Sequence, residues 1–220
     1  MFLDISGVIH SLLFFSVIVS SIVQIDLVIK RLKSPNVTTG SATTGLYRGY
    51  YLATLLGFSL FMIFGFITEK PNYYLVFTRA LALVVLVVQL FLFWFDTKNK
   101  EDTVLFTLGL LSTTAIFIFA FIGDIRATLV NYRDIFRVLI FIHGAYVCFV
   151  IYMQGEKIKE LRCLGGLSIR AQILNLFKDV SSVIFAVAMG LSDGLPIFIT
   201  NFGYLLSRRH IFKVAKCIEK

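Results

Sequence analysis

The sequence contains a succession of long apolar runs, each about as long as the α-helix that crosses a lipid bilayer. A helix of about 20 mostly apolar residues spans the hydrocarbon layer, which is about 30 Å thick. Short polar or charged segments separate the first runs, which cover residues 7–29, 43–67, 74–95, 103–122 and 135–152. The pattern predicts an all-α integral membrane protein.

Composition excludes a soluble domain of this size. Of the 220 residues, 58% are hydrophobic and 15% are charged, whereas soluble domains contain about 45–50% and about 25%. One small chain cannot bury so much apolar surface, so we expect a lipid bilayer around it. The net charge of +8 comes from basic clusters between apolar runs. Such clusters are typical of loops at a membrane face and do not indicate nucleic-acid binding.

The last third of the chain allows two interpretations. Residues 167–206 are mostly apolar, but Lys178-Asp179 and the segment 192–196 interrupt them. In the first interpretation, two helices meet at a turn of Asp193 and Gly194, and Pro196 lies in the first turn of the second helix. In the alternative, one long helix covers about 180–206 and follows an amphipathic helix at the membrane surface.

The distribution of basic residues favours two helices, and therefore about seven spans. Lys and Arg are enriched in the inner loops of membrane proteins. With seven spans and an outside or luminal amino terminus, only Lys70, Arg126 and Arg133 fall in outer loops. The residues in inner loops and the tail are Lys30, Arg31, Lys33, Lys98, Lys100, Lys157, Lys159, Arg162, Arg208, Arg209, Lys213, Lys216 and Lys220. We therefore expect the carboxyl tail in the cytosol, or in the matrix of a mitochondrion.

The first three and the last three expected spans share one layout. In each triplet a helix ends in a basic cluster, a glycine-containing inner loop follows, and a short outer turn with proline precedes the closing helix. This predicts a 3+1+3 arrangement of parallel repeats. The first three-helix repeat covers 1–100, a linker helix covers 101–125, and the second repeat with its basic tail covers 126–220.

The middle helix of each triplet carries a stripe of polar and small residues at helical spacing. The first stripe contains Thr43, Tyr47, Tyr50, Thr54 and Gly57. The second contains Ser168, Gln172, Asn175, Asp179 and Ser182. Because a polar stripe in a membrane helix faces protein or water instead of lipid, the two stripes predict one shared central cavity.

The end of the first span resembles a known motif. Residues 24–31, Gln-Ile-Asp-Leu-Val-Ile-Lys-Arg, with Lys33-Ser34 after them, are similar to the PQ-loop of the SWEET sugar transporters. Relatives of that family include lysosomal amino-acid exporters and the retrieval receptor for luminal proteins of the endoplasmic reticulum. Val23 stands where the motif has proline, and the candidate remnant in the second repeat is Met153-Gln154. The resemblance implies two parallel three-helix repeats, an outside amino terminus and a transport function.

Lys178 and Asp179 are the most unusual residues for the middle of a membrane helix. Inserting a charge there costs about 3 kcal/mol, so the charge usually has a partner or faces water. Adjacent residues of a helix point about 100° apart, so we expect the two charges not to pair well with each other. The hypothesis is a substrate or proton site; the alternative is that Lys178 reaches the interface or pairs across helices for packing.

Other polar residues complete the predicted site. The candidates for substrate binding are Tyr47, Tyr50, Thr54, Asn175, Lys178, Asp179 and Asn201. The candidates for proton coupling are His10, His143 and Asp179, because the unperturbed pKa of histidine, about 6.5, is near neutral. The alternative for each histidine is a hydrogen bond to a backbone carbonyl, and for Asn201 it is helix packing.

Several residues have a structural interpretation. Asp26 makes a favourable helical pair with Lys30, and Asp193 is expected to cap a helix or form a turn. Asn36-Val37-Thr38 matches the glycosylation sequon but falls in an inner loop, so we expect it to be unmodified.

The sequence contains no catalytic or nucleotide-binding motif, and its cysteines and histidines lack metal-ligand spacing. We therefore expect no enzyme, cofactor or metal. The leading hypothesis is a transporter that moves a small polar solute by alternating access between the triplets. The alternatives are a non-catalytic subunit or assembly factor of a larger membrane complex, and a receptor with the same fold. Expected partners are the bilayer and the solute, with other membrane subunits or a second copy as further candidates.

Overall fold

The computed structural model describes residues 2–34, 38–121 and 125–218, and all regular structure in these ranges is helical. Their long helices are α1 (Phe2–Leu32), α2 (Arg48–Ile67), α3 (Tyr73–Thr97), α4 (Lys100–Phe121), α6 (Arg133–Leu161), α7 (Ile169–Met189) and α8 (Leu191–Ile218). The short α5 (Ile125–Leu129) and the 3-10 turn η1 (Val130–Tyr132) precede α6. The all-α prediction is therefore confirmed. Asn36 of the sequon lies outside the described residues.

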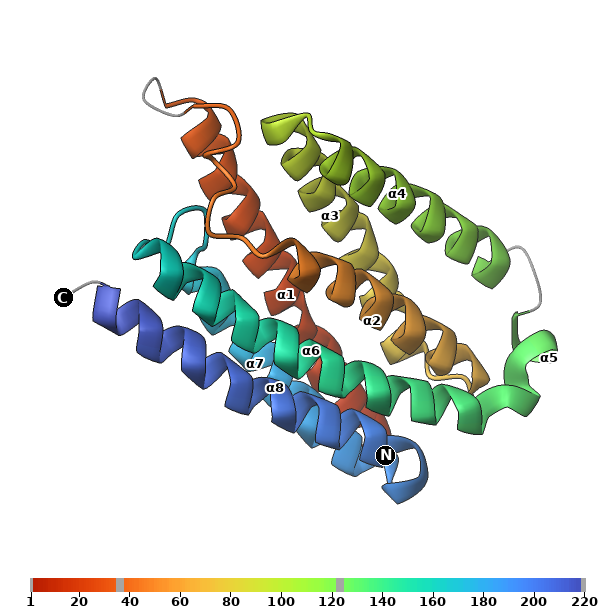
Figure 1. Ribbon diagram of the computed structural model, residues 1–220. Helices are drawn as coiled ribbons and strands as arrows, with labels where there is room; N and C mark the ends of the chain where they lie inside the picture. Colours follow the sequence, from red (N-terminus) through yellow and green to blue (C-terminus); the bar gives the residue numbers. More distant parts are fainter. Residues whose placement is uncertain (1, 35–37, 122–124, 219–220) are drawn as a thin grey trace.

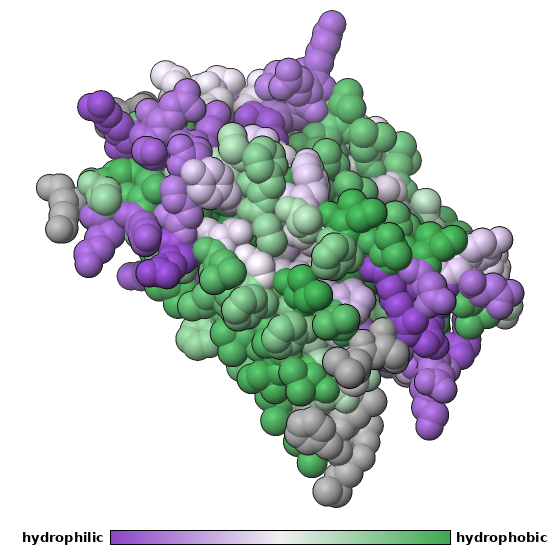
Figure 2. Space-filling model, turned by 60° about the horizontal axis from the view of Figure 1, so that its bottom comes forward, coloured by the Kyte–Doolittle hydropathy of each residue, from purple (hydrophilic) through white to green (hydrophobic). Residues whose placement is uncertain are grey.

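The helices form a membrane protein. In the described residues, six helical stretches are long and apolar enough to cross a bilayer, and they contain α1, α2, α3, α4, α6 and α7. Their outward faces are rich in large exposed hydrophobic side chains, which suit contact with lipid. Figure 2 shows one such apolar face, with hydrophilic side chains gathered at two of its opposite edges. Helix α8 is long but is not among the six, because polar residues interrupt its apolar sequence.

Two of the predicted boundaries are wrong at the end of the bundle that holds the basic loops. The second helix begins at Arg48 instead of Thr43, because the chain before it is held in a loop by Asp96 of α3. The Asp96 carboxylate accepts hydrogen bonds from the backbone N–H (2.9 Å) and the hydroxyl (2.7 Å) of Thr43. The fifth predicted span, 135–152, is longer than expected, since α6 continues through charged residues to Leu161.

Residues 167–206 form two helices, so the alternative of a single helix over 180–206 is wrong. The turn between them is not at Asp193 and Gly194, as predicted, but at Gly190, which has a positive φ of 81°. Asp193 instead lies in the first turn of α8. Its carboxylate forms ion pairs with Arg137 and, at 3.6 Å, with Arg133, which attach the start of α8 to α6.

The packing of the helices follows a regular scheme. Helix α3 packs against both α1 and α2, and α8 packs against both α6 and α7. Between these groups, α1 lies along α7 and α2 lies along α6. Helix α4 packs mainly on α3 at the periphery (Figure 1). Six long helices therefore surround the centre of the molecule, and α4 lies outside it.

The connections gather at two opposite ends of the bundle. The loop before α2, the loop before α7, the α3–α4 corner and the carboxyl end of α8 lie toward one end in Figure 1. The α2–α3 turn, α5 and the α7–α8 turn lie toward the other. A hydrogen bond from the Gly166 N–H to the Thr44 carbonyl (2.5 Å) joins the loops before α2 and α7 directly.

Small residues allow α6 and α8 to pack closely. A Cβ atom added to Gly144 of α6 would lie 2.4 Å from the Thr200 hydroxyl of α8, and one added to Gly203 of α8 would lie 2.5 Å from Cys148 Sγ. Real carbon atoms do not approach so closely, so at each position the backbone of one helix packs directly on a side chain of the other. The contact requires glycine at both positions.

We predict that Gly144→Leu destabilises the protein by about 1–3 kcal/mol, because the new side chain must push α8 away from α6. Ala145→Leu is the matched control, since Ala145 is the next residue of α6 and is exposed. Thermal unfolding of the purified protein in detergent measures the difference. Equal unfolding temperatures for the two variants would contradict the close packing of α6 on α8.

The native cysteines test whether α7 and α8 both cross the bilayer. Cys163 precedes α7, Cys217 lies near the end of α8, and both side chains are exposed. If the two helices cross in opposite directions, both thiols lie on one side of the membrane. We expect a membrane-impermeant maleimide to label both or neither in sealed vesicles of a Cys148→Ala variant. Labelling of one thiol alone from a given side would show that α7 or α8 does not cross.

Candidate functional site

A central cavity lies between the six long helices that surround the middle of the molecule. It encloses about 900 Å³ of space between atoms, its opening included. Aromatic and aliphatic side chains form much of its wall. Its polar and charged lining comes from Ser20, Ser21, Gln24, Tyr50, Tyr51, Thr54, Arg79, Gln89, His143, Gln172, Asn175, Lys178, Asn201, Tyr204 and Arg208. A largely apolar cavity with a few polar groups is the usual form of a small-molecule site.

Two glutamines close the end of the cavity beside the loops before α2 and α7; we call them the glutamine clasp. Gln24 of α1 donates to the Gly166 carbonyl and accepts from the Ser168 N–H at 3.0 Å. Gln154 of α6 donates to the Gly45 carbonyl and accepts from the Tyr47 N–H at 2.8 Å. Each side-chain amide therefore satisfies a C=O and an N–H two residues apart, just before a helix of the other group.

The two clasped loops pack directly on each other. Gly45 has a positive φ of 90°, and a Cβ atom there would lie 2.5 Å from the Leu164 carbonyl oxygen. Gly165 has a φ of 54°, and a Cβ atom there would lie 2.1 Å from the Thr44 carbonyl oxygen. Both positions need glycine for conformation and for space. The loops thus form a tight double layer over this end of the cavity.

A buried ion cluster joins α7 to α8. The Asp179 carboxylate, which is completely buried, accepts a hydrogen bond from Arg208 Nε at 2.6 Å and pairs with Lys178. Arg208 also donates from Nη1 to the Gln172 side-chain oxygen at 2.6 Å. Two cations therefore share one carboxylate in a region that excludes bulk water.

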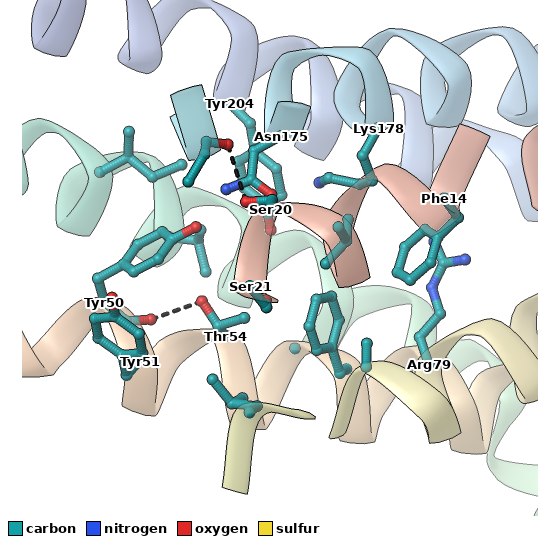
Figure 3. Close-up of a pocket in the computed structure, with 18 of the residues that line it drawn as sticks. Phe14, Ser20, Ser21, Tyr50, Tyr51, Thr54, Arg79, Asn175, Lys178 and Tyr204 are labelled. Carbon is teal, nitrogen blue, oxygen red and sulfur yellow. Dashed lines mark hydrogen bonds between the residues drawn. The ribbon is translucent and has the colours of Figure 1, made fainter. Parts of the chain in front are cut away.

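The pairing of Lys178 with Asp179 contradicts the expectation from helix geometry. Although their Cα–Cβ bonds diverge, the long lysine side chain folds back so that Nζ reaches the neighbouring carboxylate. The same ammonium group lies 3.3 Å from Asn201 Oδ1 and 4.9 Å from the centre of the Tyr204 ring, both on α8. Lys178 therefore does not extend to the membrane surface but points into the cavity (Figure 3).

Arg79, on α3, is a third buried cation. Its Nη1 lies 2.8 Å from His10 Nε2 and donates to the Thr78 hydroxyl at 2.8 Å. Its guanidinium stacks over Phe14, with the central carbon 4.1 Å from the ring centre (Figure 3). Its Nε has no hydrogen-bond partner, and none of its partners among the described residues is a carboxylate.

The structure brings several of the predicted site residues together. Five of them line the cavity with His143: Tyr50, Thr54, Asn175, Lys178 and Asn201. Asp179 lies behind this wall, and Tyr47 belongs to the clasp instead of the cavity. His143 Nε2 bonds to the Ala53 carbonyl at 2.8 Å, whereas His10 bonds to Arg79 and, through Nδ1, to Ser181 at 3.3 Å.

Sequence reasoning missed two of the three cations and interpreted Gln24 and Gln154 only as motif positions. Arg208 was assigned to the inner tail, but α8 continues to Ile218 and Arg208 is 3% exposed. Arg79 had a visible signal, since it is a lone charge inside the most apolar run of the chain. By contrast, the pair of Asp26 and Lys30 is confirmed at 2.6 Å on the exposed face of α1.

No protein-family model, curated protein or solved structure matches the chain. In the described residues, no group of three or more His, Cys, Asp or Glu side chains is arranged to hold a metal ion.

We predict that Asp179→Asn destabilises the protein more than Arg208→Gln. Loss of Asp179 leaves two buried cations without a counter-ion, which costs about 3–5 kcal/mol for such a pair. Loss of Arg208 leaves Asp179 still paired with Lys178, so the cost is smaller. Thermal unfolding in detergent ranks the variants.

The control for this ranking is Asp26→Asn, which breaks the exposed pair with Lys30. Exposed pairs contribute about 0–1 kcal/mol, so this variant should unfold close to the wild type. An Asp179→Asn protein as stable as Asp26→Asn would show that the buried cluster does not stabilise the fold.

Proposed function

We propose that the protein is a membrane transporter that moves a small polar solute by alternating access between two three-helix repeats. The glutamine clasp is the observation that carries this proposal. It ties the loops at one end of the cavity with four side-chain hydrogen bonds, beside the backbone bond from Gly166 to Thr44. Such bonds can break and re-form as the two halves move. In transporters built from repeats, the binding site lies between the repeats and the halves move against each other around it.

The helix contacts support two parallel repeats, residues 1–100 and 126–220, with α4 as the linker within 101–125. Suppose that α1, α2 and α3 of the first repeat correspond to α6, α7 and α8 of the second. When the two repeats are exchanged, the contact of α1 with α7 becomes the contact of α6 with α2, and both contacts are present. The position of α3 against α1 and α2 likewise becomes that of α8 against α6 and α7. A pseudo-twofold axis through the cavity accounts for both relations.

The clasp supports the same axis at the level of single residues. Gln24 and Gln154 occupy corresponding places near the ends of α1 and α6 and make the same pair of bonds. In the PQ-loop resemblance these two glutamines are the ones that the motif and its remnant contain. The correspondence supports a SWEET-like arrangement for this chain.

The proposed topology has seven spans, with α8 as the seventh and the amino terminus outside or luminal. Its support is that the ends of α1, α3, α6 and α8 lie at one end of the bundle and bear most of the basic residues (Figure 1). Positive charge of this kind marks the inner side of a membrane protein. Arg208 no longer belongs to this group, but Arg209, Lys213 and Lys216 remain in it.

A membrane subunit is the second candidate, and the exposure of α4 favours it. Only 17% of the residues in the most apolar window of α4 are buried inside the protein. A partner helix could pack on that face, as lipid could. Purification in one stable stoichiometric complex would support this candidate, and solute exchange by the purified protein alone would support the transporter.

We predict that a cysteine in the cavity can be reached from both sides of the membrane. The reporter is Thr54→Cys in a protein whose native cysteines are replaced, and the probe is a membrane-impermeant methanethiosulfonate reagent applied to either face of oriented vesicles. Alternating access exposes the cavity to each side in turn, so both faces should allow modification. If the reagent modifies Thr54→Cys from neither face, or from one face alone, the transport proposal is contradicted.

Opening of the clasp should increase the rate at which the reagent modifies the cavity cysteine from one side of the membrane. Gln154→Ala removes the bonds to Gly45 and Tyr47, so we expect faster modification of Thr54→Cys from the side of the clasped loops. Gln89→Ala is the control, since Gln89 lines the same cavity but donates to the Ser21 carbonyl of α1 at 3.4 Å instead of to a clasped loop. Equal rates for the two glutamine variants would show that the clasp does not control access.

A further inference from the structure

The charge of the cavity is unbalanced. Three cationic side chains line it, namely Arg79, Lys178 and Arg208, and in the described part of the chain no carboxylate does. Asp179, behind the wall, neutralises one of the cations through its shared contacts with Lys178 and Arg208. Three positive charges against one negative charge leave an excess of two. Such an excess is costly at membrane depth, where charges are normally paired.

Arg79 carries the largest part of this imbalance. The residue is 3% exposed, its Nε is buried without a partner, and its nearest polar contacts are His10 and Thr78, both formally neutral. The Phe14 ring, with its centre 4.1 Å from the central carbon of the guanidinium, stabilises the cation in part. One ring and two neutral acceptors do not replace an anion, because a guanidinium has five N–H donors.

Lys178 is also incompletely compensated. It shares Asp179 with Arg208, which holds the other carboxylate oxygen at 2.6 Å. Its remaining contacts are the amide oxygen of Asn201 and the face of the Tyr204 ring. Arg79 and Lys178 line the same cavity from α3 and α7. Figure 3 shows both on the same side of the cavity, with Phe14 next to Arg79.

We propose that the cavity binds a small organic anion whose carboxylate or phosphate group lies between Arg79 and Lys178. This inference rests on the proposed function and names the class of its solute. An anion between the two cations would supply the counter-charge that the described residues lack. Guanidinium and ammonium groups are the usual ligands of carboxylates and phosphates, and their bonds to an anion are about twice as strong as neutral hydrogen bonds.

The rest of the cavity suits the body of such a molecule. Asn175 and Asn201 offer amide groups to the cavity, and Tyr50 and Thr54 offer hydroxyls. In Figure 3, Asn175, Tyr50 and Thr54 lie away from Arg79. Phe14, Phe58 and Phe61 provide apolar walls. An organic anion with hydroxyl or short aliphatic groups is therefore a better fit than a cation. A neutral sugar would leave both cations without a counter-ion.

The test measures binding and transport separately. Isothermal titration calorimetry of the purified wild type, in a chloride-free buffer of constant ionic strength, uses succinate and glycerol 3-phosphate as anions. Glucose is the neutral probe, and choline, which has no carboxylate, is the cationic probe. We expect one of the anions to bind and neither of the other two. Which anion binds distinguishes a carboxylate site from a phosphate site.

Variants locate the anion. Arg79→Gln and Lys178→Met should each weaken anion binding at least tenfold, and Arg79→Lys, which keeps the charge, should weaken it less. Arg209→Gln is the matched control, because Arg209 follows Arg208 on α8 but is exposed. This variant should bind the anion with the affinity of the wild type. Asp179→Asn removes the competing carboxylate, so in a protein that still folds it should strengthen binding.

Flux in liposomes separates this inference from the transport proposal. An anion that binds but does not cross overturns transport and leaves the anion site intact. Glucose that crosses while no anion binds overturns the anion site and leaves transport intact. If neither succinate nor glycerol 3-phosphate binds the wild type, or if binding is unchanged in Arg79→Gln, the anion site is wrong.

Discussion

A charge inside a bilayer is stable only beside a partner or water, and this requirement determines how the interior of this protein is organised. At the end of the bundle that holds the loops before α2 and α7, charged residues form one-to-one ion pairs, such as that of Arg48 with Asp102 at 2.7 Å. At cavity depth, Lys178 and Arg208 share the Asp179 carboxylate, and Arg79 contacts no carboxylate among the described residues. Removing an isolated buried charge from water costs several kcal/mol, so the fold retains these cations against its own stability. Residues kept at such a cost are usually functional.

The clasp solves a different problem at the end of the cavity. Backbone groups at membrane depth must be hydrogen-bonded within the protein, and the irregular loops before α2 and α7 leave several of them free. Gln24 and Gln154 satisfy these groups from the helices opposite. Because the bonds are few and local, the loops can separate at a smaller cost than that of breaking two packed helices. In the proposed transport cycle, the bonds that satisfy these backbone groups would also form a movable closure.

The helices could be predicted from the sequence because lipid imposes a strong pattern on them, and the apolar runs matched α1, α3 and α4 to within a few residues. The start of α2 could not be predicted, because Asp96 holds the residues before this helix in a loop and lies 53 positions from Thr43 in the sequence. Asn175, Lys178 and Asn201 were found because polar residues stand out among apolar ones. The partners of those residues were not found. Pairing of Arg208 with Asp179 depends on how far α8 extends, and hydropathy cannot predict the length of that helix.

The positions of the two leading cations connect binding to movement. Arg79 lies on α3, in the first proposed repeat, and Lys178 lies on α7, in the second. Without an anion they repel each other and favour separation of the repeats at this depth. An anion between them attracts both and draws α3 and α7 together, so it binds the two arrangements of the repeats with different affinity. A ligand shifts a conformational equilibrium only through such a difference. In the proposed transporter, the pair of charges that would select an anion would therefore also couple its binding to the movement that opens or closes the clasp.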